Sequence, residues 1–172
     1  MRILAETYWL STHRPLMTKH LSPLIFGAIA LVACTSAAAA DKPCEPLQEF
    51  VGSVAPGETR ELKFHVIVGS NFKDRSETAY GARRCDFGGH EPGKALCQYF
   101  MEHSSIESPG YNAKSVIGCL SPKTRFGPGT WLYTISFATK VGTETRGSRV
   151  DVVLSEDKDV GGVSLSIKTT GY

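Results

Sequence analysis

The 172-residue sequence has almost no net charge once its first 40 residues are set aside. From position 41 onward sixteen Lys and Arg residues balance sixteen Asp and Glu residues, so the formal charge of +2 comes from the first 40. Proteins that bind DNA or RNA neutralise phosphates and normally carry a basic stripe. The composition therefore predicts that the protein does not bind nucleic acid.

The sequence also lacks an apolar run that is long enough to span a membrane with anchoring flanks. Residues 24–32 are almost wholly apolar, but small residues follow them at once, whereas a spanning helix needs about 20 apolar residues. No charged residue lies between Lys19 and Asp41. This pattern is typical of a secretory signal. It predicts a leader at residues 1–40, with translation starting at Met17, and a single exported domain at residues 41–172.

Two cleavage sites fit this leader. Ala38 and Ala40 satisfy the small-x-small rule of signal peptidase immediately before Asp41. Alternatively, the Leu-Val-Ala-Cys sequence that ends at Cys34 resembles the lipobox of bacterial lipoproteins, whose cysteine is lipidated. Both remain open. Each implies export to a bacterial cell envelope, either to the periplasm or secreted, or anchored to the outer membrane through lipid on Cys34.

Closely spaced metal ligands are missing as well. Cys85, His90, Cys97 and His103 supply two thiols and two imidazoles, but the two cysteines stand twelve positions apart. Structural zinc sites usually take cysteines two to four residues apart, because one tight turn must present both to a tetrahedral ion. We therefore predict no metal site.

Motifs of catalysis and cofactor binding are absent too. His90 and Glu91 lack the second histidine of a zinc protease, Ser115 lacks a glycine-flanked elbow, and the glycine-containing turns lack a phosphate-binding pattern. The sequence thus predicts no catalytic residue and no cofactor. A periplasmic hydrolase that uses His90 and Glu91 as acid and base stays an alternative function, and a structural lipoprotein is a third.

Alternation of apolar and polar residues marks four segments of the predicted domain. The first is residues 62–68, which places His65 on the solvated face, where we assign it no role; residues 131–138, 150–154 and 163–167 follow. Glycine-containing connectors between the last three favour hairpins. We expect an antiparallel sheet of about four strands, the last three forming a meander.

The apolar face of the strand expected at residues 131–138 has large side chains. It consists of Trp131, Tyr133, Ile135 and Phe137, which alternate with smaller or more polar residues. Since one face of such a strand is normally buried, all four are expected to point toward the core.

Two amphipathic helices are expected between these strands. Apolar residues recur at three- and four-residue steps from Pro92 to about Ser104, and again from about Asn112 to Leu120, with a Ser-Pro-Gly break between. A short connector favours an antiparallel helical hairpin. Combined with the strands, it defines an α+β domain.

Four cysteines remain after the leader, and an even number in an oxidising compartment predicts two disulfides. Cys97 and Cys119 each lie seven residues from the expected helix connector, so antiparallel helices would bring them level. This favours the bridges Cys97–Cys119 and Cys44–Cys85.

Residues 69–93 show no periodicity and are rich in polar, charged and glycine residues. A connection this long is often a binding loop. Tyr and Arg are frequent hot spots of interfaces, and a disulfide at Cys85 would lower the entropy that binding must overcome. The predicted binding residues are Tyr80, Arg83, Arg84, Asp86, Phe87 and His90.

These features predict a small non-enzymatic protein of the cell envelope that binds another protein, as inhibitors, immunity proteins and accessory proteins of this size do. Residues 121–129, with Lys123, Arg125 and Phe126, form a second candidate surface. Contact with a membrane is expected only through the lipid that Cys34 would carry.

Overall fold

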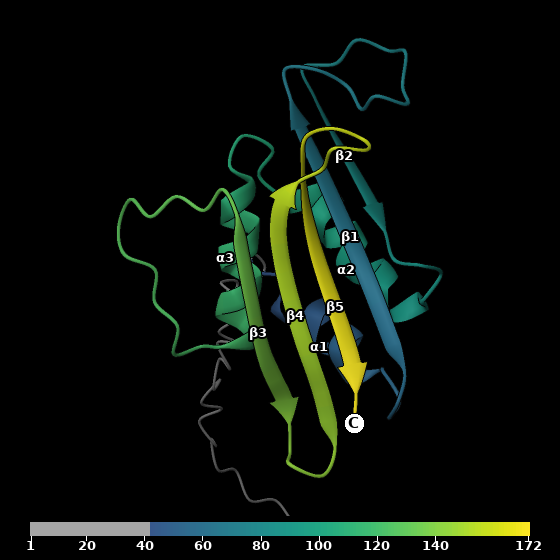
Figure 1. The fold of residues 1–172 in the computed structure, drawn as a ribbon, viewed down its shortest axis with the longest axis vertical. Coiled ribbons are helices and arrows are strands. Elements are labelled where there is room, and N and C mark those ends of the chain that lie inside the picture. Colours follow the sequence, from purple (N-terminus) through teal and green to yellow (C-terminus); the bar gives the residue numbers. More distant parts are fainter. Residues whose placement is uncertain (1–41) are drawn as a thin grey trace, which may run out of the picture. The chain divides into compact units, whose positions relative to one another are not determined.

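The computed structural model describes residues 42–172; Met17, Cys34 and both expected cleavage sites lie outside the described residues. The described chain contains three helices and five strands (Figure 1). They are α1 Cys44–Gly52, β1 Thr59–Val68, β2 Gly81–Asp86, α2 Glu91–His103, α3 Pro109–Leu120, β3 Ile135–Gly142, β4 Gly147–Glu156 and β5 Val163–Gly171.

All five strands form one antiparallel sheet in the order β2-β1-β5-β4-β3. The last three strands are neighbours, as the expected meander requires. The register aligns apolar residues of neighbouring strands: Leu165 of β5 pairs with Phe64 of β1 on one side and with Leu154 of β4 on the other. Since side chains alternate between faces, this register collects the apolar residues on one face.

Each helix contributes a short apolar stripe to the core. Leu47, Phe50 and Val51 of α1 recur at three- and four-residue steps and are buried, and α2 and α3 repeat the pattern. Burying one such side chain stabilises the fold by roughly 1.5–3 kcal/mol. The stripes of the other two helices are Leu96, Cys97 and Phe100, and Ala113, Val116 and Ile117.

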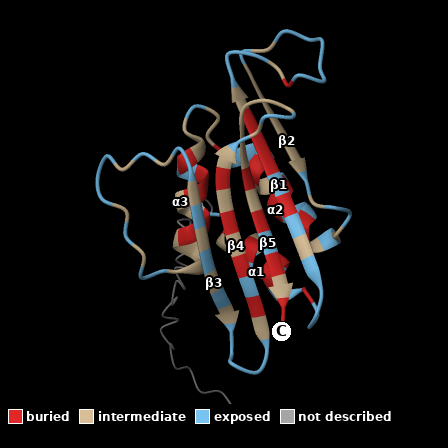
Figure 2. Ribbon diagram, viewed as in Figure 1, coloured by how far each residue is buried: buried red, intermediate tan, exposed pale blue. Residues whose placement is uncertain are grey.

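The helices cover one face of the sheet only. Figure 1 views the sheet with the helices behind it, and Figure 2 shows that the buried positions concentrate in β1, β5 and β4 while β2 and β3 are more exposed. No helix within residues 42–172 has the length and hydropathy that crossing a bilayer requires. The result is a two-layer α+β domain with an open outer sheet face.

The α+β class and the two disulfides are confirmed, whereas three details of the predicted fold are wrong. The sheet has five strands because β2 lies within residues 69–93, which were expected to be a loop. A third helix, α1, packs against both α2 and α3, so the latter do not form an isolated hairpin. The strand expected from residue 131 begins only at Ile135.

The predicted disulfide pairing is also wrong. The bridges are Cys44–Cys119 and Cys85–Cys97, not Cys44–Cys85 and Cys97–Cys119. The predicted pairing requires α2 and α3 to be each other's neighbours. Instead, α1 brings Cys44 to the end of α3, and β2 runs beside α2 and brings Cys85 to Cys97. Two disulfides fit an oxidising environment.

The two disulfides are expected to differ in their effect on stability. They span 75 and 12 residues, so by loop-closure entropy Cys44–Cys119 is worth about 4.5 kcal/mol and Cys85–Cys97 about 3 kcal/mol. We expect Cys44→Ala/Cys119→Ala to lower the free energy of unfolding more than Cys85→Ala/Cys97→Ala does in urea titrations. Non-reducing peptide mapping provides the control, and a peptide linking Cys97 to Cys119 would contradict this pairing.

Candidate binding site

The predicted binding residues do not form one surface, because β2 separates them. Successive residues of a strand point to opposite faces, so Arg83 faces α2 while Arg84 lies on the outer face. The Arg83 guanidinium donates hydrogen bonds to the backbone carbonyls of Ser104, at 2.8 Å, and Met101, at 3.4 Å. A cation there satisfies carbonyls that the last turn of α2 leaves free. Arg83 therefore fixes the end of α2.

Arg84 belongs to a small cluster on the outer face. Its guanidinium pairs with Asp74 at 2.6 Å and lies 4.5 Å from the centre of the Phe72 ring. Phe72 is buried because the loop between β1 and β2 folds over that face and packs it against His65. The pairing holds the pKa of the Asp74 carboxyl below its usual value. Arg84 thus anchors the loop.

The remaining predicted residues lie apart from one another. Tyr80 is fully exposed next to β2. The Asp86 carboxylate accepts a hydrogen bond from the Gly88 backbone N–H at 2.8 Å and shapes the turn before α2. Phe87 is half-buried against the core.

His90 connects two helices. Its Nε2 lies 2.8 Å from the Ser53 hydroxyl, which donates its own proton to the Phe50 carbonyl at 2.8 Å. With that proton engaged, the Ser53 oxygen accepts a hydrogen bond from His90, so Nε2 is the donor in this contact. Glu91 instead pairs with Lys94, at 2.9 Å. His90 therefore joins the end of α1 to the start of α2.

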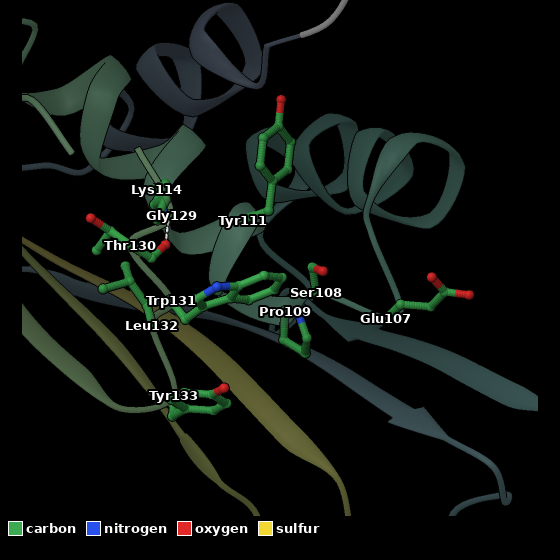
Figure 3. Close-up of a pocket in the computed structure, with 11 residues that line it drawn as sticks. Glu107, Ser108, Pro109, Tyr111, Lys114, Gly129, Thr130, Trp131, Leu132 and Tyr133 are labelled. Atoms are coloured by element: carbon green, nitrogen blue, oxygen red, sulfur yellow. Dashed lines mark hydrogen bonds between the residues drawn. The ribbon is translucent and has the colours of Figure 1, made fainter. Parts of the chain in front are cut away.

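The most open aromatic surface lies elsewhere, at the first turn of α3. Tyr111, Trp131 and Tyr133 are 61%, 68% and 79% exposed and line one cleft of about 410 Å³. In Figure 3 the Trp131 ring lies beside Pro109, Tyr133 follows on the same segment, and Tyr111 rises from α3. Large aromatic side chains gathered in the open are unusual for a stable monomer surface and mark candidate binding sites.

The cleft exists because one glycine allows the segment before β3 to lie against α3. A Cβ atom on Gly110 would stand 2.3 Å from the Leu132 carbonyl oxygen and 3.0 Å from the Leu132 Cβ. Leu132 occupies this space and turns its side chain toward the core, so its neighbours Trp131 and Tyr133 turn outward. The expectation that both aromatic residues face inward is therefore wrong.

Two further contacts hold the walls of the cleft. The Lys114 ammonium donates a hydrogen bond to the Thr130 carbonyl (dashed in Figure 3) and lies 5.7 Å from the centre of the Phe126 ring. On the opposite side, the buried Asn112 amide exchanges two hydrogen bonds with the Ser105 backbone, at 2.9 and 3.0 Å. The segment before α3 and the segment before β3 are thus both held to α3.

The cleft contains one cation and one anion that are not paired with each other. Lys114 is half-buried at its base, and Glu107 is exposed at its rim. Within residues 42–172 neither forms an ion pair, since the seven ion pairs found there involve other residues. A binding partner can therefore meet aromatic rings, a lysine and a carboxylate in one place.

The cleft was not predicted from the sequence, although a predicted surface lies next to it. The second candidate surface, residues 121–129, includes Phe126, which packs under Lys114. The signal lay in Trp131 and Tyr133: two large aromatic residues directly after a turn rich in glycine and proline. The alternation of apolar and polar residues does not show that residues 131–134 lie before the strand, where the side chains that face the core are no longer those expected from the alternation.

Comparisons with known proteins add no assignment to this geometry: no family model, curated protein or solved structure matches the chain.

Substitution of two glycines of α3 tests the origin of the cleft. Gly110→Ala should lower the free energy of unfolding by about 1–3 kcal/mol, because the new methyl group forces Leu132 off the helix. Gly118 has open space around its Cβ position, so Gly118→Ala should raise stability by about 0.5–1 kcal/mol. Urea unfolding measures both. Equal effects of the two substitutions would contradict the close packing of Leu132.

The outer-face cluster predicts a loss of stability in mild acid. Burial, and secondarily the charges of Arg84 and Lys63, lower the pKa of His65 below its ordinary 6.5, although Asp157 at 3.2 Å opposes the shift. The unfolded chain then binds the proton more readily than the folded chain. Stability is therefore complete above about pH 6.5 and falls as the pH drops toward the folded pKa.

We expect His65→Gln to flatten this dependence between about pH 7.5 and 5.5 in urea unfolding, since glutamine does not titrate. His103→Gln, at the exposed end of α2, is the matched control for the loss of one histidine. A His65→Gln slope equal to that of the wild type would contradict the role of His65.

Proposed function

We propose that this protein is a non-enzymatic binding module of the bacterial cell envelope that recognises another protein through the aromatic cleft at α3. The observation that carries the proposal is the gathering of Tyr111, Trp131 and Tyr133 around one cleft of about 410 Å³. Ligand and side-chain pockets commonly measure about 300–1,000 Å³. The cleft therefore has room for a large side chain of a partner.

The residue types of the cleft support a protein partner. Tyrosine and tryptophan dominate the hot spots of protein interfaces, because their rings bury much apolar area at little cost in side-chain entropy. Burial of apolar surface stabilises a complex by roughly 25 cal/mol per Å² before the costs of association. Lys114 and Glu107 would supply polar contacts that fix orientation.

Rigid walls also support binding. The Asn112 and Lys114 contacts and the Gly110 packing hold the cleft in shape before any partner arrives. Preorganisation lowers the entropy lost on association. The leader predicted at residues 1–40 and the two disulfides support the proposed compartment, whether the chain is cleaved before Asp41 or lipidated at Cys34.

Affinity capture tests the proposal. The protein purified after expression of the full chain is exposed to envelope extract, and bound proteins are identified by mass spectrometry. We expect a stoichiometric partner that is lost with Trp131→Ala/Tyr133→Ala, because removal of two hot-spot aromatic side chains typically weakens binding by tenfold or more.

Tyr80→Ala is the matched control, since Tyr80 is fully exposed but lies outside the cleft. This variant should retain the partner. If Tyr80→Ala loses the partner and the double variant retains it, the binding surface is the loop before β2 rather than the cleft. Retention by every variant would exclude the cleft.

A further inference from the structure

The strand that follows the aromatic cleft has an open edge. Gly147 of β4 exchanges both of its backbone hydrogen bonds with Tyr172, beyond β5, at 2.9 and 3.2 Å. The backbone groups of an antiparallel strand alternate in direction. The backbone N–H and C=O groups of Ser148 and Val150 therefore point to β3, where they pair with those of Val141 and Thr139. The backbone N–H and C=O groups of Ser136, Ala138 and Lys140 therefore point away from the sheet.

These outward groups have no partner in the part of the chain that the structure describes. β3 is the last strand of the sheet order, and no hydrogen bond joins its outer edge to another segment of residues 42–172. The edge begins two residues after Tyr133, so it continues directly from the cleft. A row of alternating donors and acceptors at this spacing is complementary to one kind of molecule, another extended polypeptide.

We infer that the partner of this protein binds by strand addition: an extended segment of another polypeptide pairs with β3 and places an aromatic or large apolar side chain in the cleft of Trp131 and Tyr133. The inference rests on the function proposed above and specifies how the same site is used. Backbone hydrogen bonds to β3 supply affinity, and the cleft supplies specificity.

Charge further defines this segment. Lys140 is exposed beside the open edge, 5.5 Å from the centre of the Tyr172 ring, and makes no ion pair within residues 42–172. An acidic residue of the partner segment can lie opposite it. Because a strand rises about 3.3 Å per residue, the acidic residue is expected about six to eight positions from the aromatic one.

The same lysine disfavours a second copy of this chain as the occupant. The sequence of β3, ISFATKVG, contains no acidic residue. Pairing of two β3 strands would bring two lysines to the same sheet face without a carboxylate of β3 to neutralise either. Lysine at an edge protects against such self-association, whereas an acidic partner is not rejected.

Selection from a display library of random linear peptides tests this inference. The probe is the most enriched peptide of about twelve residues, and its dissociation constant is measured by fluorescence polarisation. We expect an aromatic and an acidic residue at the stated spacing. Trp131→Ala should weaken binding by about tenfold or more.

The matched pair Ala138→Pro and Ala138→Val isolates the backbone contact. Proline removes an outward N–H that makes no hydrogen bond within the sheet, and proline is tolerated at such positions of edge strands. Ala138→Pro should weaken the peptide by about tenfold, whereas Ala138→Val, which keeps the N–H, should bind like the wild type. Thermal unfolding confirms that each variant is folded.

Each outcome decides between the two proposals. Binding that depends on Trp131 but is unchanged by Ala138→Pro overturns strand addition and leaves the cleft as the binding surface. A peptide whose binding depends on neither residue overturns both. Failure to enrich any peptide, or self-association of the wild type that Ala138→Pro abolishes, overturns the extended polypeptide partner.

Discussion

The inner face of the five-stranded sheet must be covered, and the arrangement of the remaining elements depends on this constraint. Three helices of nine to thirteen residues share the task, each through a stripe of three buried side chains. The first helix lies against the other two, and the disulfides join it to α3 and join α2 to β2. Since every helix lies on the inner face, no helix covers the outer face or the edge of β3.

Where periodicity reflects burial directly, the fold could be predicted from the sequence. Phe64, Val150 and Ile167 alternate with polar neighbours because one face of each central strand meets the core. β2 escaped detection because its residues from Gly81 to Cys85 are all partly exposed on both faces, which removes the period-two pattern. The disulfide pairing could not be predicted because it depends on which elements are neighbours in space. The unpredicted helix α1 changes the neighbours of Cys97 and Cys119.

The surroundings of the predicted binding residues follow less directly from the sequence than the fold does, for a related reason. A cluster of arginines in sequence becomes two separate contacts once a strand places Arg83 and Arg84 on opposite faces, where each satisfies a local structural need. Conversely, Trp131 and Tyr133 have the alternation of buried residues, yet the fit of Leu132 against Gly110 reverses their direction. A single close contact between distant segments thus determines which side chains reach the surface.

The two edges of the sheet differ in a way that bears on recognition. At the start of β2, the Ile106 side chain packs closely on Gly81, where an added Cβ atom would lie 3.1 Å from it. Farther along, Arg83 bonds the end of α2, and a disulfide joins Cys85 to that helix. These contacts hold β2 to α2 and to the segment before α3 on the inner face of the sheet. β3 makes no hydrogen bond at its outer edge among the described residues, and Lys140 is its one charged residue. A positively charged edge disfavours pairing with its own copies but accepts a segment of opposite charge, which supports the proposal that recognition takes place on the side of the aromatic cleft.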